Sequence, residues 1–359
     1  MGKIKVLIVD DSAVIRKVLG DLLREDPEIE VVGTAANGKI ALAQLAELKP
    51  DVVTLDVEMP EMNGLETVKA MRDGGATQPI IMCSSLTAHG ASTTLDALAL
   101  GASDYVTKPS SHGVNTREVV GEDLLRKIKG LASTRAPDAR PATGTPAALW
   151  GSAPVPVAAA AFDAIAIGVS TGGPNALMEI FPKIPCDLPV PIFLVQHMPP
   201  LFTKMLAERL TEVSKIKVFE AHNGQDVVPG CAYLAPGGFH MEVKRVIGRT
   251  SIVLNENPPE NSCRPAVDVL FRSVAAVYGA KALAAVLTGM GQDGLLGCQA
   301  IRAKGGTIVA QDKDSSAVWG MPGAVVEAGI ASAVLPLGQV ADALSGAVKR
   351  AENRAEARA

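Results

Sequence analysis

Residues 163–174 read DAIAIGVSTGGP, an apolar run that ends in a serine among glycines. The run predicts a buried strand, and the glycines and the proline predict a tight turn into a helix. Similar apolar runs alternate with helical patterns on both sides of this stretch, which is typical of a parallel sheet covered by helices. We therefore predict an α/β protein with two doubly wound parallel-sheet domains.

A change of composition separates the two domains. Residues 132–161 consist mainly of Ala, Pro, Thr, Gly and Ser and have too little apolar bulk for a core, which predicts a linker. The expected boundaries are 1–128 for the first domain, 129–161 for the linker, 162–350 for the second domain and 351–359 for a polar tail.

Each domain contains several expected strands. In the first they are Lys5–Val9, Glu30–Gly33, Val52–Leu55, Pro79–Cys83 and Asp104–Val106. In the second they are Asp163–Val169, Val190–Gln196, Ala232–Ala235, Leu283–Thr288 and Thr307–Gln311. The section from Lys215 to Leu254 is rich in Gly and Pro turns and predicts hairpins.

Composition excludes several classes of protein. The chain has 34 basic and 38 acidic residues, a net charge of −4 and only 3% aromatic residues, so nothing favours nucleic-acid binding. The best membrane candidate, Val274–Leu287, is too short and is interrupted by Lys281, so we expect a cytoplasmic protein without membrane insertion. The five cysteines form no metal-binding or disulfide pattern.

Acidic residues follow two strands of the first domain. Asp10 and Asp11 follow one strand and Asp56 ends another, and the carboxyl ends of parallel strands share one edge. Three converging carboxylates repel one another unless a hard divalent cation such as Mg²⁺ is bound. Ser84 and Lys108 follow two further strands and are expected at the same edge.

These residues, with the run Met59-Pro60-x-x-x-Gly64 and with Tyr105 ahead of Lys108-Pro109, resemble a response-regulator receiver domain with a flavodoxin-like fold. The resemblance covers residues 3 to about 125. It implies phosphoryl transfer from a histidine kinase to Asp56, with Asp10, Asp11 and Asp56 as Mg²⁺ ligands. It also implies that Lys108 pairs with the phosphoryl group and that Ser84 and Tyr105 respond to it.

The second domain carries the pattern G-x-S-x-G around Ser170. Such a turn lifts the serine hydroxyl clear of the sheet and directs backbone amides toward developing negative charge. Two other interpretations of this turn are a serine that caps a helix in an ordinary turn and a dinucleotide-binding site. The dinucleotide-binding site is excluded because the G-x-G-x-x-G spacing is absent.

A nucleophilic serine requires a base and an orienting carboxylate. His197 directly follows the strand after the serine strand, whereas His89, His112, His222 and His240 lie elsewhere. Asp293 follows another buried strand within the run Gly289-Met290-Gly291-Gln292-Asp293-Gly294. Asp312 is its competitor. The glycines let the backbone around Met290 approach the substrate and donate an amide to an oxyanion.

Six sequence blocks in the second domain carry a second resemblance. They are Gly168-x-Ser170-Thr171-Gly172-Gly173, Gln196-His197-Met198-Pro199, Ala235-Pro236-Gly237, Arg264-Pro265-x-Val267-Asp268, Gly289-Met290-Gly291-x-Asp293-Gly294 and Gly320-Met321-Pro322. Together they resemble the catalytic domain of chemotaxis protein-glutamate methylesterases, which implies a Rossmann-like domain with a hairpin section.

That resemblance implies hydrolysis of glutamyl methyl esters on chemoreceptor signalling helices and deamidation of receptor glutamines, without a cofactor for the ester step. Departures from the family pattern are Leu201 in place of glycine, Gly238-Phe239, and Ser262-Cys263 in place of bulkier residues. Two alternatives stay open: a non-catalytic interaction protein and an esterase of another pathway. We expect the unphosphorylated receiver to restrain the second domain.

Overall fold

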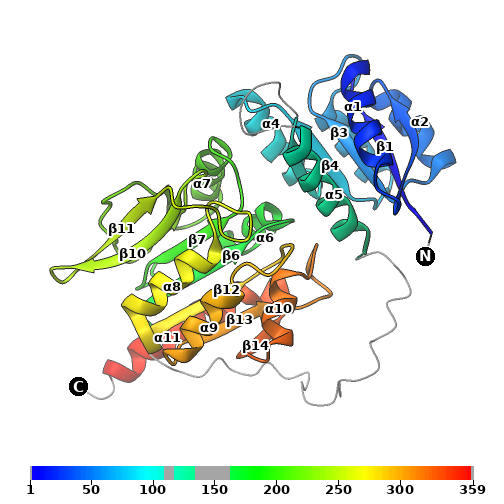
Figure 1. The fold of residues 1–359 in the computed structure, drawn as a ribbon. Coiled ribbons are helices and arrows are strands. Elements are labelled where there is room, and N and C mark those ends of the chain that lie inside the picture. Colours follow the sequence, from blue (N-terminus) through cyan, green and yellow to red (C-terminus); the bar gives the residue numbers. More distant parts are fainter. Residues whose placement is uncertain (1, 109–116, 134–161, 357–359) are drawn as a thin grey trace. The chain divides into compact units, whose positions relative to one another are not determined.

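The computed structural model describes residues 2–108, 117–133 and 162–356 (Figure 1). The chain divides into two compact units, residues 1–135 and 136–359, each with its own parallel sheet. Most of the expected linker and His112 lie outside the described residues. Helix α5 (Arg117–Ser133) extends past the boundary expected at 128, and helix α11 (Leu337–Glu356) extends past the one expected at 350.

The first unit contains five parallel strands in the order β2-β1-β3-β4-β5, which is the flavodoxin-like order. The strands are β1 (Ile4–Val9), β2 (Ile29–Ala35), β3 (Val52–Asp56), β4 (Ile80–Ser84) and β5 (Asp104–Thr107). The other helices of this unit are α1 (Ala13–Arg24), α2 (Gly38–Leu48), α3 (Gly64–Asp73) and α4 (Ala88–Ala99). The five expected strands are all present, and their ends shift by at most two residues.

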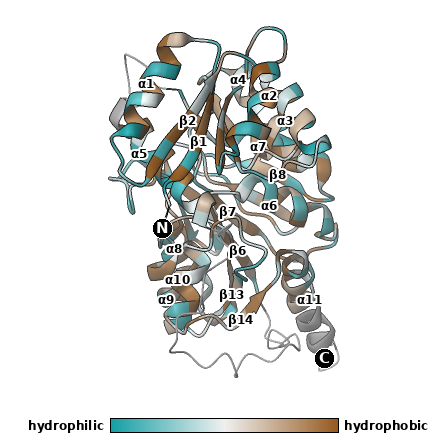
Figure 2. Ribbon diagram, turned by 90° about the vertical axis from the view of Figure 1, so that its right-hand side faces the viewer, coloured by the Kyte–Doolittle hydropathy of each residue, from teal (hydrophilic) through white to brown (hydrophobic). Residues whose placement is uncertain are grey.

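Burial and capping explain these elements. Every residue of β3 and β4 is buried, as expected for strands covered on both faces. The helices carry alternating hydrophilic and hydrophobic bands (Figure 2), so one face of each can pack on the sheet. Ser12 and Asn37 cap α1 and α2, and Asn63 forms a capping box with Glu66 at the start of α3.

The second unit contains seven parallel strands in the order β14-β13-β12-β6-β7-β9-β8. The strands are β6 (Ala164–Val169), β7 (Ile192–Gln196), β8 (Lys217–Glu220), β9 (Cys231–Leu234), β12 (Ala282–Val286), β13 (Thr307–Gln311) and β14 (Ala333–Leu335). The remaining helices are α6 (Gly173–Ile180), η1 (Phe181–Lys183), α7 (Phe202–Val213), α8 (Val267–Tyr278), η2 (Gly279–Lys281), α9 (Leu295–Ala303) and α10 (Met321–Glu327).

Two strand expectations are corrected. The strand expected to reach Thr288 ends at Val286, because the backbone N–H of Thr288 turns to donate to the side chain of Gln311. Hairpins were expected within residues 215–254, and one is present there, but β8 and β9 pair in parallel within the main sheet. The one hairpin described here consists of β10 (His240–Val246) and β11 (Arg249–Asn255).

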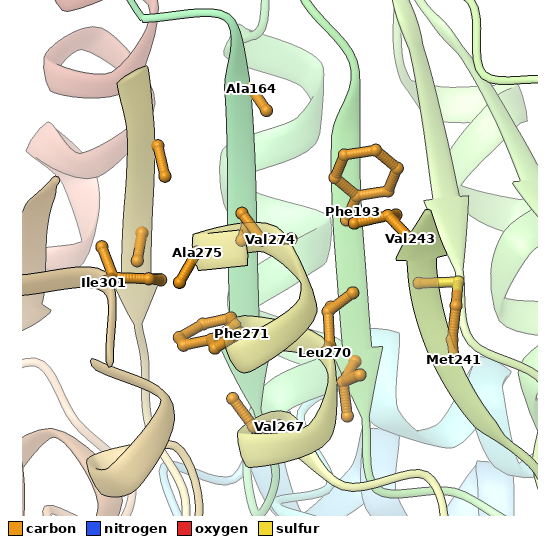
Figure 3. Close-up of a cluster of buried hydrophobic side chains, with 14 of the residues drawn as sticks. Ala164, Phe193, Met241, Val243, Val267, Leu270, Phe271, Val274, Ala275 and Ile301 are labelled. Atoms are coloured by element: carbon orange, nitrogen blue, oxygen red, sulfur yellow. The ribbon is translucent and has the colours of Figure 1, made fainter. Parts of the chain in front are cut away.

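The core of the second unit lies between helix α8, the sheet and this hairpin. Figure 3 shows Phe193 of β7 and Met241 and Val243 of β10 on one side of α8, with Ile301 of α9 on the other. The contact between β6 and α8 is close: a Cβ on Gly168 would lie 2.3 Å from Val267 Cγ1. Packing therefore fixes the start of α8 beside the carboxyl end of β6, where the connections leave in opposite directions and ligands commonly bind.

Candidate active site

Ser170 lies on the turn between β6 and α6. Its backbone N–H donates to Thr288 O at 3.0 Å, and Gly173 N–H donates to Ser170 O at 2.7 Å. Gly172 adopts a φ of 74°, a left-handed conformation that glycine reaches without steric cost. This tight turn leaves the serine half-buried at the edge of the sheet with its hydroxyl accessible to a partner.

His197 occupies the matching position on the neighbouring strand. Val169 of β6 pairs with Gln196 of β7, so the residues that follow them, Ser170 and His197, lie side by side. The distance from Ser170 Oγ to His197 Nδ1 is 3.0 Å. Gln196 holds this arrangement, because its Nε2 donates to Ser170 O at 3.0 Å and to His197 O at 3.3 Å.

Asp293 contacts the other ring nitrogen. Its Oδ2 lies 2.7 Å from His197 Nε2. A carboxylate can only accept, so Nε2 carries a proton, and in the neutral ring the lone pair of Nδ1 faces Ser170. In the familiar serine-protease triad Nε2 faces the serine and Nδ1 faces the aspartate. Here the two nitrogens exchange places, but either one can act as a base.

Backbone donors keep Asp293 charged. The N–H groups of Val267, Asp268 and Gly294 donate to it at 2.7, 3.0 and 3.0 Å. Burial opposes ionisation, but His197 and, to a smaller extent, the N–H groups of Val267 and Asp268 outweigh it and hold the pKa of Asp293 below its usual value. Two of the donors lie in the first turn of α8, where a helix favours negative charge.

His197 has a strongly perturbed pKa. Burial disfavours the protonated ring, but the charge of Cys263 and the contact with Asp293 outweigh it and raise the pKa to about 10. Only 13% of the His197 side chain is exposed, so these two neighbours decide its protonation.

The loop after β12 lines the serine. Gly320 and Met321 N–H groups both donate to Gly289 O, which fixes this loop. Within the described residues, the N–H of Met290 donates no hydrogen bond, so it is free to bind a ligand oxygen. A side chain on Gly289 would meet both Met321 and Ser170.

The competing residues serve other purposes. Asp312 accepts hydrogen bonds from Ser315 N and Oγ at 3.0 and 2.6 Å and so closes a local turn. His240 is buried and bonds to Ala266 and Pro258. His89 lies 3.8 Å from Glu58, and His222 contacts the backbone of its neighbour Asn223.

Asn261 and Cys263 are neighbours of these groups that were not predicted from the sequence. Asn261 Nδ2 lies 3.0 Å from both Asp293 Oδ1 and Asp268 Oδ2, and thus bridges two buried carboxylates. Cys263 Sγ lies 3.5 Å from His197 Nδ1. No local sequence pattern marks either residue. The one available signal was that Ser262-Cys263, just before Arg264, departs from the family pattern.

The acidic edge of the first unit forms a second candidate site. Asp10, Asp11 and Asp56 each offer a carboxylate oxygen, and these atoms lie within 4.8 Å of one another. Lys108 Nζ lies 2.7 Å from Asp56 Oδ1 and 2.9 Å from Asp10 Oδ2. Lys108 therefore lies at the same sheet edge as the three carboxylates, as expected from its position after β5.

The pKa values at this edge reflect burial and charge. Burial, with the Asp10 charge adding to it, raises the pKa of Asp56 to about 6 although Lys108 opposes the shift. Lys108 is itself desolvated, but the two carboxylates outweigh this and raise its pKa. Lys108 is therefore cationic at neutral pH.

The carboxylates suit a magnesium ion, which prefers oxygen ligands. Asp10 Oδ2 is fully buried and makes no well-directed hydrogen bond among the described residues, although Lys108 Nζ is near it. An acceptor with spare capacity is what a cation would use. Asp11 is exposed and can turn toward the same point.

The other two expected receiver residues are buried. Ser84 is fully buried at the end of β4, and Lys108 N–H donates to its carbonyl oxygen at 2.7 Å. Tyr105 of β5 is 4% exposed, with Lys127 Nζ 5.0 Å from its ring centroid. Burial raises the pKa of Tyr105, so its hydroxyl stays neutral.

Comparison with known proteins gives the same two parts. A family model for the CheB methylesterase matches residues 165–344, and one for the response regulator receiver domain matches residues 6–117. The chain is 51% identical over 342 residues to a protein-glutamate methylesterase/protein-glutamine glutaminase of Nocardioides sp., covering 94% of this chain and 93% of that protein. It belongs to the CheB methylesterase family.

Other CheB relatives support the assignment. A protein-glutamate methylesterase/protein-glutamine glutaminase of Trichodesmium erythraeum is 46% identical, with 95% of this chain and 98% of that protein covered. The crystal structure of the Thermotoga maritima CheB methylesterase catalytic domain matches with a TM-score of 0.51 and 43% identity, covering 52% of this chain and 99% of that one. The expected family and the expected parallel α/β fold are thus confirmed.

Proposed function

We propose that this CheB-family chain hydrolyses glutamyl methyl esters, and glutamine side-chain amides, on the cytoplasmic signalling helices of chemoreceptors. Both activities appear in the names of its full-length relatives. The observation that carries the proposal is the hydrogen-bonded series from Ser170 Oγ through the His197 ring to Asp293 Oδ2. It lies at the turn where a methylesterase of this family would bind its ester.

The proposed chemistry has two steps. Ser170 Oγ attacks the ester carbonyl while His197 Nδ1 accepts the serine proton; the acyl C–O bond then breaks, and His197 returns the proton to the departing methoxide as methanol. Water next attacks the acyl-enzyme, with His197 as base, and releases the glutamate and free Ser170. Asp293 orients the imidazole and stabilises its protonated form throughout.

Backbone amides would stabilise the oxyanion of both steps. The N–H of Met290 is the proposed donor, supported by its freedom from other hydrogen bonds and by the closeness of Gly289 to Ser170. For glutamine the same route releases ammonia in place of methanol.

We further propose that a histidine kinase phosphorylates Asp56 and that this raises esterase activity. Asp10, Asp11 and Asp56 would hold Mg²⁺, which when bound offsets negative charge on the phosphoryl oxygens. Lys108 would hold the phosphoryl group after transfer, and Ser84 and Tyr105 would respond to it. The match to a receiver model over residues 6–117 supports this part.

Two rival functions differ in what they predict. A non-catalytic interaction protein would not need three side chains at hydrogen-bond distance beside a free amide. A small-molecule esterase would share the chemistry but not the substrate. Among the described residues, no helix qualifies as a membrane span.

The test is methanol release from methylated receptor membranes, run beside hydrolysis of a small acyl ester. We expect release by the parent chain, its loss in Ser170→Ala, and an increase when a small phosphodonor and Mg²⁺ are added. The melting temperature of Ser170→Ala should change little, because the serine is half-buried and adds little packing. Release at the parental rate by Ser170→Ala would reject the proposed nucleophile.

A further inference from the structure

Two side chains compete for one atom of His197. Ser170 Oγ lies 3.0 Å from Nδ1, and Cys263 Sγ lies 3.5 Å from the same nitrogen. An imidazole nitrogen that carries no proton has a single lone pair in the ring plane. It cannot accept the serine hydroxyl and the thiol at full strength at once.

A strained turn positions Cys263 beside His197 Nδ1. Glu260 and Cys263 exchange backbone hydrogen bonds of 3.1 and 2.9 Å, and the residues between them, Asn261 and Ser262, have φ values of 51° and 61°. Two consecutive left-handed residues are costly outside glycine and persist where the surroundings impose them. The ion pair of Glu260 with Arg272, at 2.6 Å, anchors the turn to α8.

Few charged groups surround this contact. Asp293, in the loop after β12, is bonded to the far ring nitrogen. Asp268 of α8 reaches the site only through Asn261. Glu260 is engaged by Arg272, and the guanidinium of Arg264 is bonded to the carbonyls of Glu256 and Asn257. Cys263 is thus the ionisable group next to Nδ1.

We propose that Cys263 is a positioning residue that restrains the hydrolytic site by competing with Ser170 for His197 Nδ1. This proposal rests on the proposed roles of Ser170 and His197. In the restrained state the thiol proton moves from Sγ to Nδ1, which leaves a thiolate beside an imidazolium. The imidazolium has no lone pair left for the proton of Ser170, so the serine cannot be activated until the proton returns to sulfur.

The electrostatics of the site favour such a pair. Asp293 stabilises positive charge on the ring, as it does during ester hydrolysis. Cys263 is the stronger of the two charges that raise the pKa of His197 above its usual value. Here the pair stands beside a serine that needs the same base.

The first test is the pH dependence of ester hydrolysis in the intact protein. The acid limb of kcat/KM reports the ionisation of the free enzyme's base. Without the thiol, in Cys263→Ala or Cys263→Ser, the plateau of kcat/KM above that limb should rise and the limb should move to higher pH, because the inactive thiolate–imidazolium pair is no longer formed. A limb about one pH unit higher corresponds to a plateau about tenfold higher, while kcat/KM well below both limbs stays the same. The control is Cys186→Ala, which removes an exposed cysteine of the same unit and should leave the limb unchanged.

The second test does not depend on esterase activity. Iodoacetamide reacts with thiolates, and labelling of Cys263 and Cys186 can be followed separately by peptide mass spectrometry. At pH 7 the labelling of Cys263 should slow about tenfold or more in His197→Asn, while that of Cys186 should not change. The proposal is overturned if the acid limbs of both Cys263 variants coincide with that of Cys186→Ala, or if His197→Asn labels Cys263 at the parental rate. A failed esterase assay with a positive labelling result would instead reject the proposed function.

Discussion

Gly289 lies so close to Ser170 that a Cβ on the glycine would be 2.9 Å from the Cβ of the serine. The same Cβ would be 2.3 Å from Met321 Sδ. The loop that carries the Met290 amide and the turn that carries Ser170, the proposed nucleophile, are therefore closely packed.

Gly289→Ala should damage catalysis more than stability. The new methyl group must displace Ser170 or the loop, and loss of one oxyanion donor typically lowers kcat by about 10²-fold or more. Overpacking itself costs about 1–3 kcal/mol of unfolding free energy. Methanol release and calorimetry test this. Gly338→Ala is the control, because a Cβ on Gly338 would lie no closer than 3.7 Å to another side chain, that of Glu179. Parental kcat in Gly289→Ala would contradict the placement of the oxyanion site.

Asp293→Asn should lower kcat strongly but leave residual activity, because Ser170, His197 and the backbone donors remain. The loss of charge removes stabilisation of the imidazolium. Asp312→Asn is the matched control, and it should act only through its local turn with Ser315. Steady-state ester hydrolysis by both variants is the measurement. A larger loss in Asp312→Asn than in Asp293→Asn would reverse the assignment.

Phosphoryl labelling from a small phosphodonor should require Asp56, Mg²⁺ and Lys108. We expect no label in Asp56→Asn, and slower labelling in Lys108→Ala because a positioned cation is lost. EDTA should block it in the parent. The control is Lys39→Ala, because Lys39 forms an exposed ion pair with Glu61. Labelling at an undiminished rate in EDTA would exclude the metal site.

The free energy of unfolding of the first unit should decrease as the pH rises from about 4 to about 6. In this window the unfolded chain releases the Asp56 proton, while the folded protein, with a pKa raised to about 6 by burial, keeps it. At about 1.4 kcal/mol per pH unit, the loss reaches about 3 kcal/mol by pH 6. Asp56→Asn should lack this loss, and Mg²⁺ should reduce it in the parent.

Calorimetry of the full chain measures this effect, and the transition that responds to Mg²⁺ identifies the first unit. Below about pH 4 the parent and Asp56→Asn should differ least, since the carboxyl is neutral in both states. An equal decline of both proteins from pH 4 to pH 6 would show that Asp56 is not the group responsible.

Leu201→Gly should stabilise the second unit. The backbone of Leu201 has a φ of 72° and a ψ of −47°. Such a conformation costs a side-chain-bearing residue about 1–3 kcal/mol, and 40% of Leu201 is exposed, so little packing is lost. We expect a rise of a few degrees in Tm, measured by calorimetry. Leu296→Gly, in the regular helix α9, should instead lower Tm.

The sequence by itself determined which strands form and which residues follow them. Short apolar runs that alternate with helical patterns are typical of parallel strands buried between helices, and chemistry-bearing side chains that follow such runs gather at one edge. For this reason Ser170, His197 and Asp293 could be predicted as a group, as could Asp10, Asp56 and Lys108.

Only the tertiary structure decided what surrounds those groups. The amides of α8 that bind Asp293, the bridge that Asn261 makes to it, and the thiol of Cys263 beside His197 come from a segment distant in sequence from all three. Their contacts depend on a left-handed turn and on the packing of α8 against β6, neither of which leaves a periodic pattern. Periodicity fixes which residues reach an edge, whereas non-local packing fixes the pKa values found there.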